Sequence, residues 1–419
     1  MKRPAPPSTN TSGHETAPDA QLETGWFTRL LARSFGYQRY APVPADLADR
    51  ITVLGIPNAR FWADSQGEAL AHEVQQALER EKAAAGKTES SAGDLPPANF
   101  VAISGGSDDG SFGAGLICGW SDAGTMPTFK LVTGISTGSM IAPFAFLGRS
   151  YMDGLRSVYT KIGPDDVLKK RGVHHAVFGE ALADTAPLYG LITHHINEQA
   201  LADISTEYNK GRLLLIGTAS LDAQRPVIWN IGAIAASGDP GALELIRKIL
   251  RASSAVPGIF EPVMIDVTLN GKKYQELHVD GGAIAQMFLY PPSIELSRFG
   301  TREREAYLIR NNREDPDWAN VQRRTLSVSG RAISVMLKAS GANDLTRIYF
   351  VTQRDGVDYN LAYIESDFRT PHPDKDFDKA YMSALFDYAY QKARNGYPWR
   401  KSPPLLAGLE QQPQAARSP

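Results

Sequence analysis

The sequence is poor in the residues that stabilise small secreted proteins and in those that bind metals. Its 419 residues include a single cysteine, Cys118, so no disulfide can form within the chain. The CxxC, Cys/His and HExxH spacings that mark zinc sites are missing as well. Cys118 lies in the apolar run Gly115–Trp120, which favours a small buried side chain over a reactive thiol. We therefore expect neither a disulfide framework nor a metal site.

Long apolar runs and blocks of one charge are also missing. No stretch approaches the roughly 20 apolar residues that span a bilayer. Lys2 and Arg3 are not followed by the apolar core of a secretory signal. With 44 basic and 46 acidic residues, the formal net charge is −2, and no long basic block stands out. We therefore expect no nucleic-acid partner, and a protein of the cytoplasm or of the membrane surface.

Composition divides the chain into four regions. Residues 1–20 are rich in proline, serine, threonine and alanine and are expected to be disordered. Residues 21–97 form an N-terminal extension that ends in a linker of glycine, serine and proline. The catalytic domain is expected at 98–365, followed by a C-terminal extension, residues 366–419, with a disordered end.

Two helices are predicted in the N-terminal extension. In residues 24–35, large apolar side chains at positions 27, 31 and 35 recur at helical spacing, with two arginines on the other side. Such a helix either packs against the main domain, as most amphipathic helices do, or places its aromatic side chains in a membrane surface as a peripheral contact. Residues 66–84 combine good helix formers with a charged face and predict the second helix.

From residue 100 onward, short apolar segments alternate with longer amphipathic ones. The short segments predict strands and the longer ones predict helices. This alternation favours an α/β fold with a mostly parallel sheet that is covered on both faces. The predicted strands are 100–104, 129–133, 212–219, 227–231, 276–279, 304–311 and 347–353, and the predicted helices are 111–120, 136–148, 240–252 and 326–337.

The sharpest chemical motif is Gly134-Ile-Ser136-Thr-Gly138, directly after the predicted strand at 129–133. A serine on a tight turn between a strand and a helix is lifted out of the sheet, and the flanking glycines tolerate the close approach of backbone. The helix N-terminus directs free N–H groups toward the reacting centre. A turn of glycine and serine without catalytic meaning is the alternative, but the strand–turn–helix context favours Ser136 as a nucleophile.

A glycine-rich loop follows the predicted strand at 100–104. Consecutive backbone N–H groups in such a loop can hold an anion, which in acyl transfer is the tetrahedral oxyanion. A phosphate-binding nucleotide loop is the competing interpretation. However, the glycine spacing fits neither GxGxxG nor GxxxxGK[ST], and two adjacent carboxylates would repel a pyrophosphate. The candidate oxyanion donors are the backbone amides of Gly105, Gly106, Ser107, Asp108 and Gly110.

A carboxylic acid ends another predicted strand, in Val279-Asp280-Gly281-Gly282. By itself this motif is most often just a turn. A buried acid at Asp280 would be able to accept the proton of a serine hydroxyl, because desolvation raises the pKa of a carboxylate and makes it a stronger base. A serine hydroxyl needs such a group, since it is a poor nucleophile until its proton is removed.

These three motifs, in this order, resemble those of the patatin-like phospholipase family. Residues 252–263 (Ala-Ser-Ser-Ala-Val-Pro-Gly-Ile-Phe-Glu-Pro-Val) are similar to the family's segment ahead of its catalytic acid. The resemblance runs from about residue 100 to residue 280 and implies a three-layer α/β/α fold with a Ser–Asp dyad. It also implies that Ser136 is the nucleophile, Asp280 the base and the 105–110 amides the oxyanion hole. The glycines that flank the two catalytic residues are Gly134, Gly138, Gly281 and Gly282.

The glycine-rich loop departs from the family pattern, which reads Gly-Gly-Gly-x-Arg-Gly. Ser107 stands at the third glycine and Asp109 at the arginine. The backbone donors survive both changes if the loop's backbone angles suit a residue other than glycine. The aspartate removes a positive charge that can orient the loop or bind an anionic headgroup, which bears on phospholipid preference more than on hydrolysis.

Histidine distinguishes a dyad from a triad. His278 lies two residues before Asp280, on the same face of a strand, and can support it. His372 follows Asp280 in the Ser…Asp…His order of α/β-hydrolases, but a histidine between two prolines is more typical of a surface loop. The histidine pairs at 174–175 and 194–195 lack the i, i+4 spacing of metal ligands and are expected to be structural or to face solvent.

The sequence therefore predicts a serine hydrolase that cleaves lipid-like acyl esters through an acyl-enzyme intermediate, with a lipid or lipid-like ester as substrate. Neither a metal nor an organic cofactor is needed for this chemistry. Two other functions stay open. One is a catalytically silent binding or scaffold protein of the same fold, and the other is an esterase with a Ser–His–Asp triad.

Overall fold

The computed structural model describes residues 39–87, 93, 95–167, 169–170, 183–316, 318–373 and 375–406. The chain divides into two compact units, residues 1–39 and 40–419, and the described helices and strands belong to the second. The predicted N-terminal disorder, the predicted helix at 24–35, the histidine pair at 174–175 and the chain end from residue 407 lie outside the described residues.

A mixed sheet of nine strands forms the centre of this unit. Its strands are β1 (Arg60–Trp62), β2 (Ala98–Ile103), β3 (Phe129–Gly134), β6 (Leu213–Ser220), β7 (Arg225–Asn230), β8 (Val263–Leu269), β9 (Lys272–Asp280), β10 (Arg304–Arg313) and β11 (Asp358–Ile364). The strand order is β1-β7-β6-β3-β2-β10-β11, and β9 pairs with both β6 and β8. Five neighbouring strands, β6, β3, β2, β10 and β11, run parallel to one another. The pairs β1–β7, β7–β6, β6–β9 and β9–β8 are antiparallel. A separate antiparallel pair joins β4 (Lys169–Lys170) to β5 (Ala183–Asp184).

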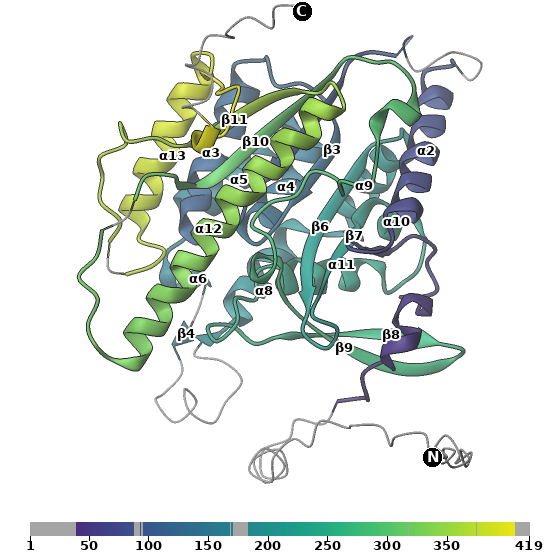
Figure 1. The fold of residues 1–419 in the computed structure, drawn as a ribbon, viewed down its shortest axis with the longest axis horizontal. Helices are drawn as coiled ribbons and strands as arrows, with labels where there is room; N and C mark the ends of the chain where they lie inside the picture. Colours follow the sequence, from purple (N-terminus) through teal and green to yellow (C-terminus); the bar gives the residue numbers. More distant parts are fainter. Residues whose placement is uncertain are drawn as a thin grey trace, which may run out of the picture. The chain divides into compact units, whose positions relative to one another are not determined.

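Helices cover both faces of the sheet (Figure 1). They are α2 (Gly67–Ala84), α3 (Gly110–Asp122), α4 (Thr137–Leu147), α5 (Met152–Thr160), α6 (Pro164–Val167), α8 (Ala186–His195), α9 (Glu198–Asn209), α10 (Ile231–Ala236), α11 (Ala242–Ser253), α12 (Thr325–Arg354) and α13 (Lys379–Arg394). Among the described helices, none has the length and apolarity needed to cross a bilayer.

Side chains alternate between two apolar cores along each central strand. In β2, Val101 and Ile103 join the core with α3, α4, α5, α8, α11 and α13, whereas Phe100 and Ala102 join the core with α2 and α12. This follows from the two-residue period of a strand, which sends successive side chains to opposite faces. The predicted α/β fold, with a mostly parallel sheet between two helical layers, is therefore confirmed.

The pairing of β6 brings distant parts of the chain to one point of the sheet. Residues 213–216 of β6 pair with β3, and residues 218–220 pair with the end of β9. Strand β7 pairs along the other edge of β6. Strands β3 and β9 therefore share one edge of β6, and β9 pairs with it beyond the point where β3 ends. Strand β3 ends at Gly134 and β9 ends at Asp280, so the residues that follow β3 lie next to the end of β9.

Segments on both sides of residues 98–365 pack into the same unit. Strand β1 extends the sheet beside β7, and α13 lies against α3. The two helices approach so closely that a Cβ atom on Gly115 would come within 2.2 Å of the Phe386 carbonyl oxygen, and one on Gly119 within 2.3 Å of the Tyr390 carbonyl oxygen. Glycine at these two positions therefore permits the contact.

The prediction of a strand at 347–353 is wrong, since these residues form the last turns of α12. The run Ile-Tyr-Phe-Val has the β-branched and aromatic composition of a strand. However, Leu345, Ile348 and Thr352 are buried at i, i+3 and i+7, so the segment buries one helical face against the sheet. The last strand is instead β11, which follows four residues after α12 ends.

Candidate active site

Ser136 lies on a sharp turn between β3 and α4, with φ of 55° and ψ of −127°. A residue with a Cβ atom adopts this left-handed region only at a cost of about 1–2 kcal/mol, so neighbouring contacts must hold it. The Ser136 amide donates to Ser253 Oγ at 3.0 Å, and Ser253 Oγ in turn donates to the Gly217 carbonyl at 2.8 Å. On the other side, Ser139 Oγ donates to the Ser136 carbonyl at 2.6 Å. Ser136 is 9% exposed, so the hydroxyl lies at the floor of the site rather than on the surface.

Asp280 meets Ser136 at the end of β9. Its backbone amide donates to the Ala255 carbonyl at 2.9 Å, and its Oδ1 accepts the Gly282 amide at 2.7 Å. Burial raises the pKa of Asp280 to about 7, and hydrogen bonds from the Ser136 hydroxyl and the Gly282 amide oppose this rise. The structure therefore brings the predicted nucleophile and base into hydrogen-bond contact, although 144 positions separate them in the sequence.

The glycine-rich loop runs beside the serine, because a Cβ atom on Gly105 would lie 3.2 Å from Ser136 Cβ. Not all of its amides can face an oxyanion. The Gly105 amide donates to the Gln286 carbonyl at 3.1 Å, and the Gly110 amide donates to the carbonyls of the preceding turn. This corrects the predicted set of donors, since an N–H that already donates to a carbonyl is not available. The amides of Gly106, Ser107 and Asp108 remain as candidates.

Two of these residues have unusual backbone angles. Gly106 has φ of 157°, and a Cβ atom there would lie 2.0 Å from the Asn311 carbonyl oxygen, so only glycine fits. Ser107 has φ of 54°, a value at which glycine costs less than serine. The loop thus keeps a glycine-like shape at the position where serine replaces the family's third glycine.

The two loop aspartates bind the C-terminal part of the chain. Asp108 lies 3.1 Å from His372 Nε2 through its Oδ1 and accepts the Phe377 amide at 2.9 Å through its Oδ2. The Tyr381 hydroxyl donates to Asp109 Oδ1 at 2.6 Å. Asp108 raises the pKa of His372 to about 9, so the imidazole is charged at neutral pH. Burial raises the pKa of Asp109 to about 6.

Among the described residues, one group of side chains has the donors for a metal ion. Ligand atoms of Asp108, Asp109 and His372 all lie within 4.8 Å of one another. Each of the two carboxylates already has a hydrogen-bond partner from residues 372–381, and the histidine is paired with Asp108. These contacts account for the group without an ion.

An apolar pocket of about 90 Å³ opens beside the nucleophile. Ser107, Ser136 and Thr137 form its polar end, where Thr137 Oγ1 lies 2.7 Å from the Tyr159 hydroxyl. Side chains of α4, α5, α8, α11, α13 and the loop after α11 line the remainder, and they include Met140, Phe144, Val158, Leu188, Ile192, His195, Leu250, Phe260 and Met382. Such a lining fits a hydrocarbon chain whose polar end reaches the serine.

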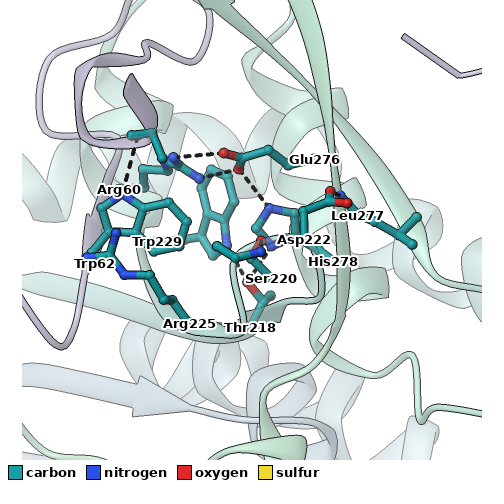
Figure 2. Close-up of polar contacts among 12 residues, drawn as sticks. Arg60, Trp62, Thr218, Ser220, Asp222, Arg225, Trp229, Glu276, Leu277 and His278 are labelled. Atoms are coloured by element: carbon teal, nitrogen blue, oxygen red, sulfur yellow. Dashed lines mark hydrogen bonds and ion pairs between the residues drawn. The ribbon is translucent and has the colours of Figure 1, made fainter. Parts of the chain in front are cut away.

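His278 belongs to a buried network on the antiparallel part of the sheet (Figure 2). Its Nδ1 lies 3.0 Å from Thr218 Oγ1, and its Nε2 lies 3.1 Å from a carboxylate oxygen of Glu276. Glu276 forms an ion pair with Arg60 of β1, and Trp229 Nε1 donates to Thr218 Oγ1 at 2.8 Å. Burial lowers the pKa of His278, so the ring is neutral at neutral pH.

This network bears on the choice between a dyad and a triad. Both ring nitrogens of His278 already have partners other than Ser136 and Asp280. His372 is engaged with Asp108 rather than with Asp280. Thr218, which His278 contacts, pairs with Asp280 across β6 and β9. Asp280, rather than either of these histidines, is therefore the group in contact with the Ser136 hydroxyl, and His278 contacts residues that hold β9.

One family model and several solved structures are similar to this chain. A model described as patatin-like phospholipase matches residues 101–291. No curated protein matches the sequence significantly. VipD from Legionella pneumophila aligns at 12% identity over 72% of this chain and 67% of its own, with a TM-score of 0.37. Human GIVD cytosolic phospholipase A2 aligns at 11% identity over 74% of this chain and 55% of its own, with a TM-score of 0.32, so the chain spans about half of that enzyme's length.

Proposed function

We propose that the protein hydrolyses lipid-like acyl esters, because residues 101–291 match the model of the patatin-like phospholipase family, whose members are generally serine hydrolases. The observation that carries the proposal is the contact between the Ser136 hydroxyl and a buried Asp280. A base acts best when its pKa is close to the working pH, and burial brings the pKa of Asp280 to about 7.

The reaction has two steps. Asp280 takes the proton of the Ser136 hydroxyl while Oγ attacks the ester carbonyl carbon, and the carbonyl electron pair moves onto oxygen. The amides of Gly106 and Ser107 stabilise this oxyanion, and one such donor contributes about 2.7–4 kcal/mol to lowering the barrier. Collapse of the intermediate expels the alcohol, which receives the proton from Asp280. Water then attacks the acyl-enzyme, Asp280 again removes and returns a proton, and the carboxylic acid leaves.

The pocket favours substrates with an apolar acyl group. Its wall is mostly hydrocarbon, and Ser136 is one of the few polar residues that line it. Burial of each CH₂ group of a chain is worth about 0.8 kcal/mol. We therefore expect kcat/KM to rise with acyl length until the pocket is filled, whichever alcohol the ester carries.

The test is release of p-nitrophenol from a medium-chain ester. Ser136→Ala should abolish turnover, and Asp280→Asn should do almost as much damage. Ser237→Ala, at the end of α10, is the matched control and should keep wild-type activity, because Ser237 Oγ bonds only nearby backbone: it donates to the Ile234 carbonyl and accepts the Asp239 amide. A fluorophosphonate probe should label wild type and the control but not Ser136→Ala.

Three results would contradict the proposal. Near-normal turnover by Ser136→Ala would remove the serine from the mechanism. Absence of both turnover and labelling in folded wild-type protein would instead support a catalytically silent binding protein. A strong loss in His372→Ala, together with a mild effect of Asp280→Asn, would favour a Ser–His–Asp triad.

A further inference from the structure

The first half of α12 and the loop before it expose an unusual number of apolar side chains. Trp318 is 95% exposed and Met336 is 69% exposed. Exposed apolar groups of this size are seldom found together on a soluble surface without a binding role. We use the name α12 surface for these two residues together with Val321, Val328, Ile333 and Val335, which are also exposed.

The length of α12 explains why this segment is uncovered. The helix has 30 residues and is therefore about 45 Å long. Strand β11, to which it returns, has seven residues and needs only about 23 Å. The second half of the helix packs on the sheet through Leu345 and Ile348. The first half extends past the end of the sheet, as Figure 1 shows for the lower part of α12.

The α12 surface begins at the edge of the sheet that carries the active site. Strands β2, β3 and β10 run parallel, so their carboxyl ends lie at the same edge. The glycine-rich loop follows β2, Ser136 follows β3, and the segment that leads to α12 follows β10. Asn311, near the end of β10, donates to the Ser104 carbonyl at 2.9 Å directly before the glycine-rich loop.

Acidic residues stand at positions 314, 315 and 317, directly before Trp318, but from Trp318 to the middle of α12 every charge is positive. Between Trp318 and Asn343 the chain carries Arg323, Arg324, Arg331 and Lys338 and no acidic residue, whereas the whole chain has a formal net charge of −2. A cation close to an anionic lipid surface increases binding roughly fivefold. Apolar side chains mixed with cations, on a helix that does not span the bilayer, are typical of segments that lie in a membrane interface.

We propose that the α12 surface docks the protein on an anionic phospholipid bilayer. The apolar side chains enter the boundary between headgroups and acyl chains, and the four cations contact the anionic headgroups. Docking at this edge places the mouth of the active site beside its substrate. This consequence rests on the proposed function, but binding to the bilayer can be measured without any turnover.

The experiment is co-sedimentation with vesicles of phosphatidylcholine alone and of phosphatidylcholine mixed with phosphatidylglycerol. Wild type should bind the mixed vesicles, and binding should weaken as salt is added. The double variant Ile333→Glu, Met336→Glu should bind at least about tenfold less, because two carboxylates then face anionic lipid. Phe350→Glu is the matched control: Phe350 is 59% exposed on the half of α12 that packs on the sheet, and binding should be unchanged.

Three outcomes would overturn the docking surface. They are equal binding of wild type and the double variant, equal loss in the Phe350 control, and no vesicle binding by wild type. If wild type binds no vesicles but forms a dimer, and the double variant is a monomer, then a second copy of the chain covers the surface instead. Circular dichroism should show that all variants are folded.

Turnover separates this proposal from the proposed function. The double variant should hydrolyse a soluble p-nitrophenyl ester at the wild-type rate and lose activity only on mixed vesicles. If wild type binds vesicles but hydrolyses no ester of either kind, docking is supported and the proposed hydrolase function fails. If the soluble ester is hydrolysed and the vesicles are not bound, the hydrolase function is supported and docking fails.

Discussion

Asp280 connects the proposed catalysis to stability, because the carboxylate that we propose as the base is also a charge that burial penalises. Burial raises its pKa from the ordinary value of 3.8 to about 7. In the unfolded chain the same carboxyl is solvated and releases its proton near pH 4. Between about pH 4 and pH 7, the folded protein therefore holds a proton that the unfolded chain has lost. Stability must fall as the pH rises through this window.

The size of the penalty follows from the two pKa values. The interval is about three pH units at about 1.4 kcal/mol each, so the penalty reaches about 4 kcal/mol above pH 7. An asparagine has nearly the same shape and no charge, and its oxygen can still accept the Gly282 amide. The unfolding free energy of Asp280→Asn should therefore exceed that of wild type, and this difference should increase by roughly 3 kcal/mol between pH 5 and pH 8.

Urea unfolding, followed by tryptophan fluorescence at several pH values, measures this difference. Asp109 and Asp344, whose pKa values burial also raises, are present in both proteins and cancel in the comparison. Asp266→Asn, at an exposed carboxylate on β8, is the control and should show no such trend. In parallel, kcat/KM of wild type on a soluble ester should fall about tenfold for each pH unit below 7.

A constant difference between Asp280→Asn and wild type at every pH would refute the reasoning. It would mean that the Asp280 carboxyl titrates in the folded protein as it does in the unfolded chain. The argument that burial makes it a base near neutral pH would then fail, even if the substitution abolished activity.

Three further substitutions test the parts around the dyad. Ser107→Gly should keep turnover of a soluble ester within about twofold, because the proposed donor is the backbone amide; a large loss would implicate the hydroxyl. His372→Gln removes the charged partner of Asp108, so turnover should be lower than in wild type, and the two pH profiles should converge above pH 9, where the histidine itself loses its charge; profiles that run parallel throughout would contradict this. Arg60→Met leaves Glu276 buried without its cation and should lower the unfolding free energy by about 3 kcal/mol in urea titrations. An unchanged unfolding midpoint would show that the network of Figure 2 does not stabilise β9.

The local parts of the site are predictable from the sequence. The elbow at Ser136 depends on an apolar strand, two nearby glycines and a helix, and all of these lie between residues 129 and 148. The positions of β2, β3, β6, β9 and β10 also follow from short apolar runs that end at turn residues. Such features are set by the spacing of neighbouring residues, so the chain's local pattern is sufficient.

Contacts between distant segments are not predictable in this way. Nothing near Asp108 indicates that its partner is His372, because 264 positions separate the two residues. Likewise, the sequence places several amides in the glycine-rich loop without showing that the Gln286 carbonyl accepts the one of Gly105. Ser253 lies in a segment that already resembled the family, but its hydrogen bond to the Ser136 amide depends on how α11 packs under the elbow.

The strand wrongly predicted at 347–353 has a different cause. Its β-branched and aromatic side chains favour a strand by intrinsic preference, and the helix forms because tertiary burial of Leu345, Ile348 and Thr352 outweighs that preference. Helical periodicity from 345 to 352 is the signal that would have identified it.

The contacts of Asp108 and Asp109 can form only late in translation, because their partners lie far toward the C-terminus. Ser136 and Asp280 emerge first, whereas His372, Phe377 and Tyr381, which hold the two aspartates, are translated about a hundred residues after the acid. Until then the two aspartates of the glycine-rich loop lack these partners. Under the proposed function, a nascent chain that already contains both Ser136 and Asp280 therefore still lacks the residues that hold the two aspartates of the loop beside them.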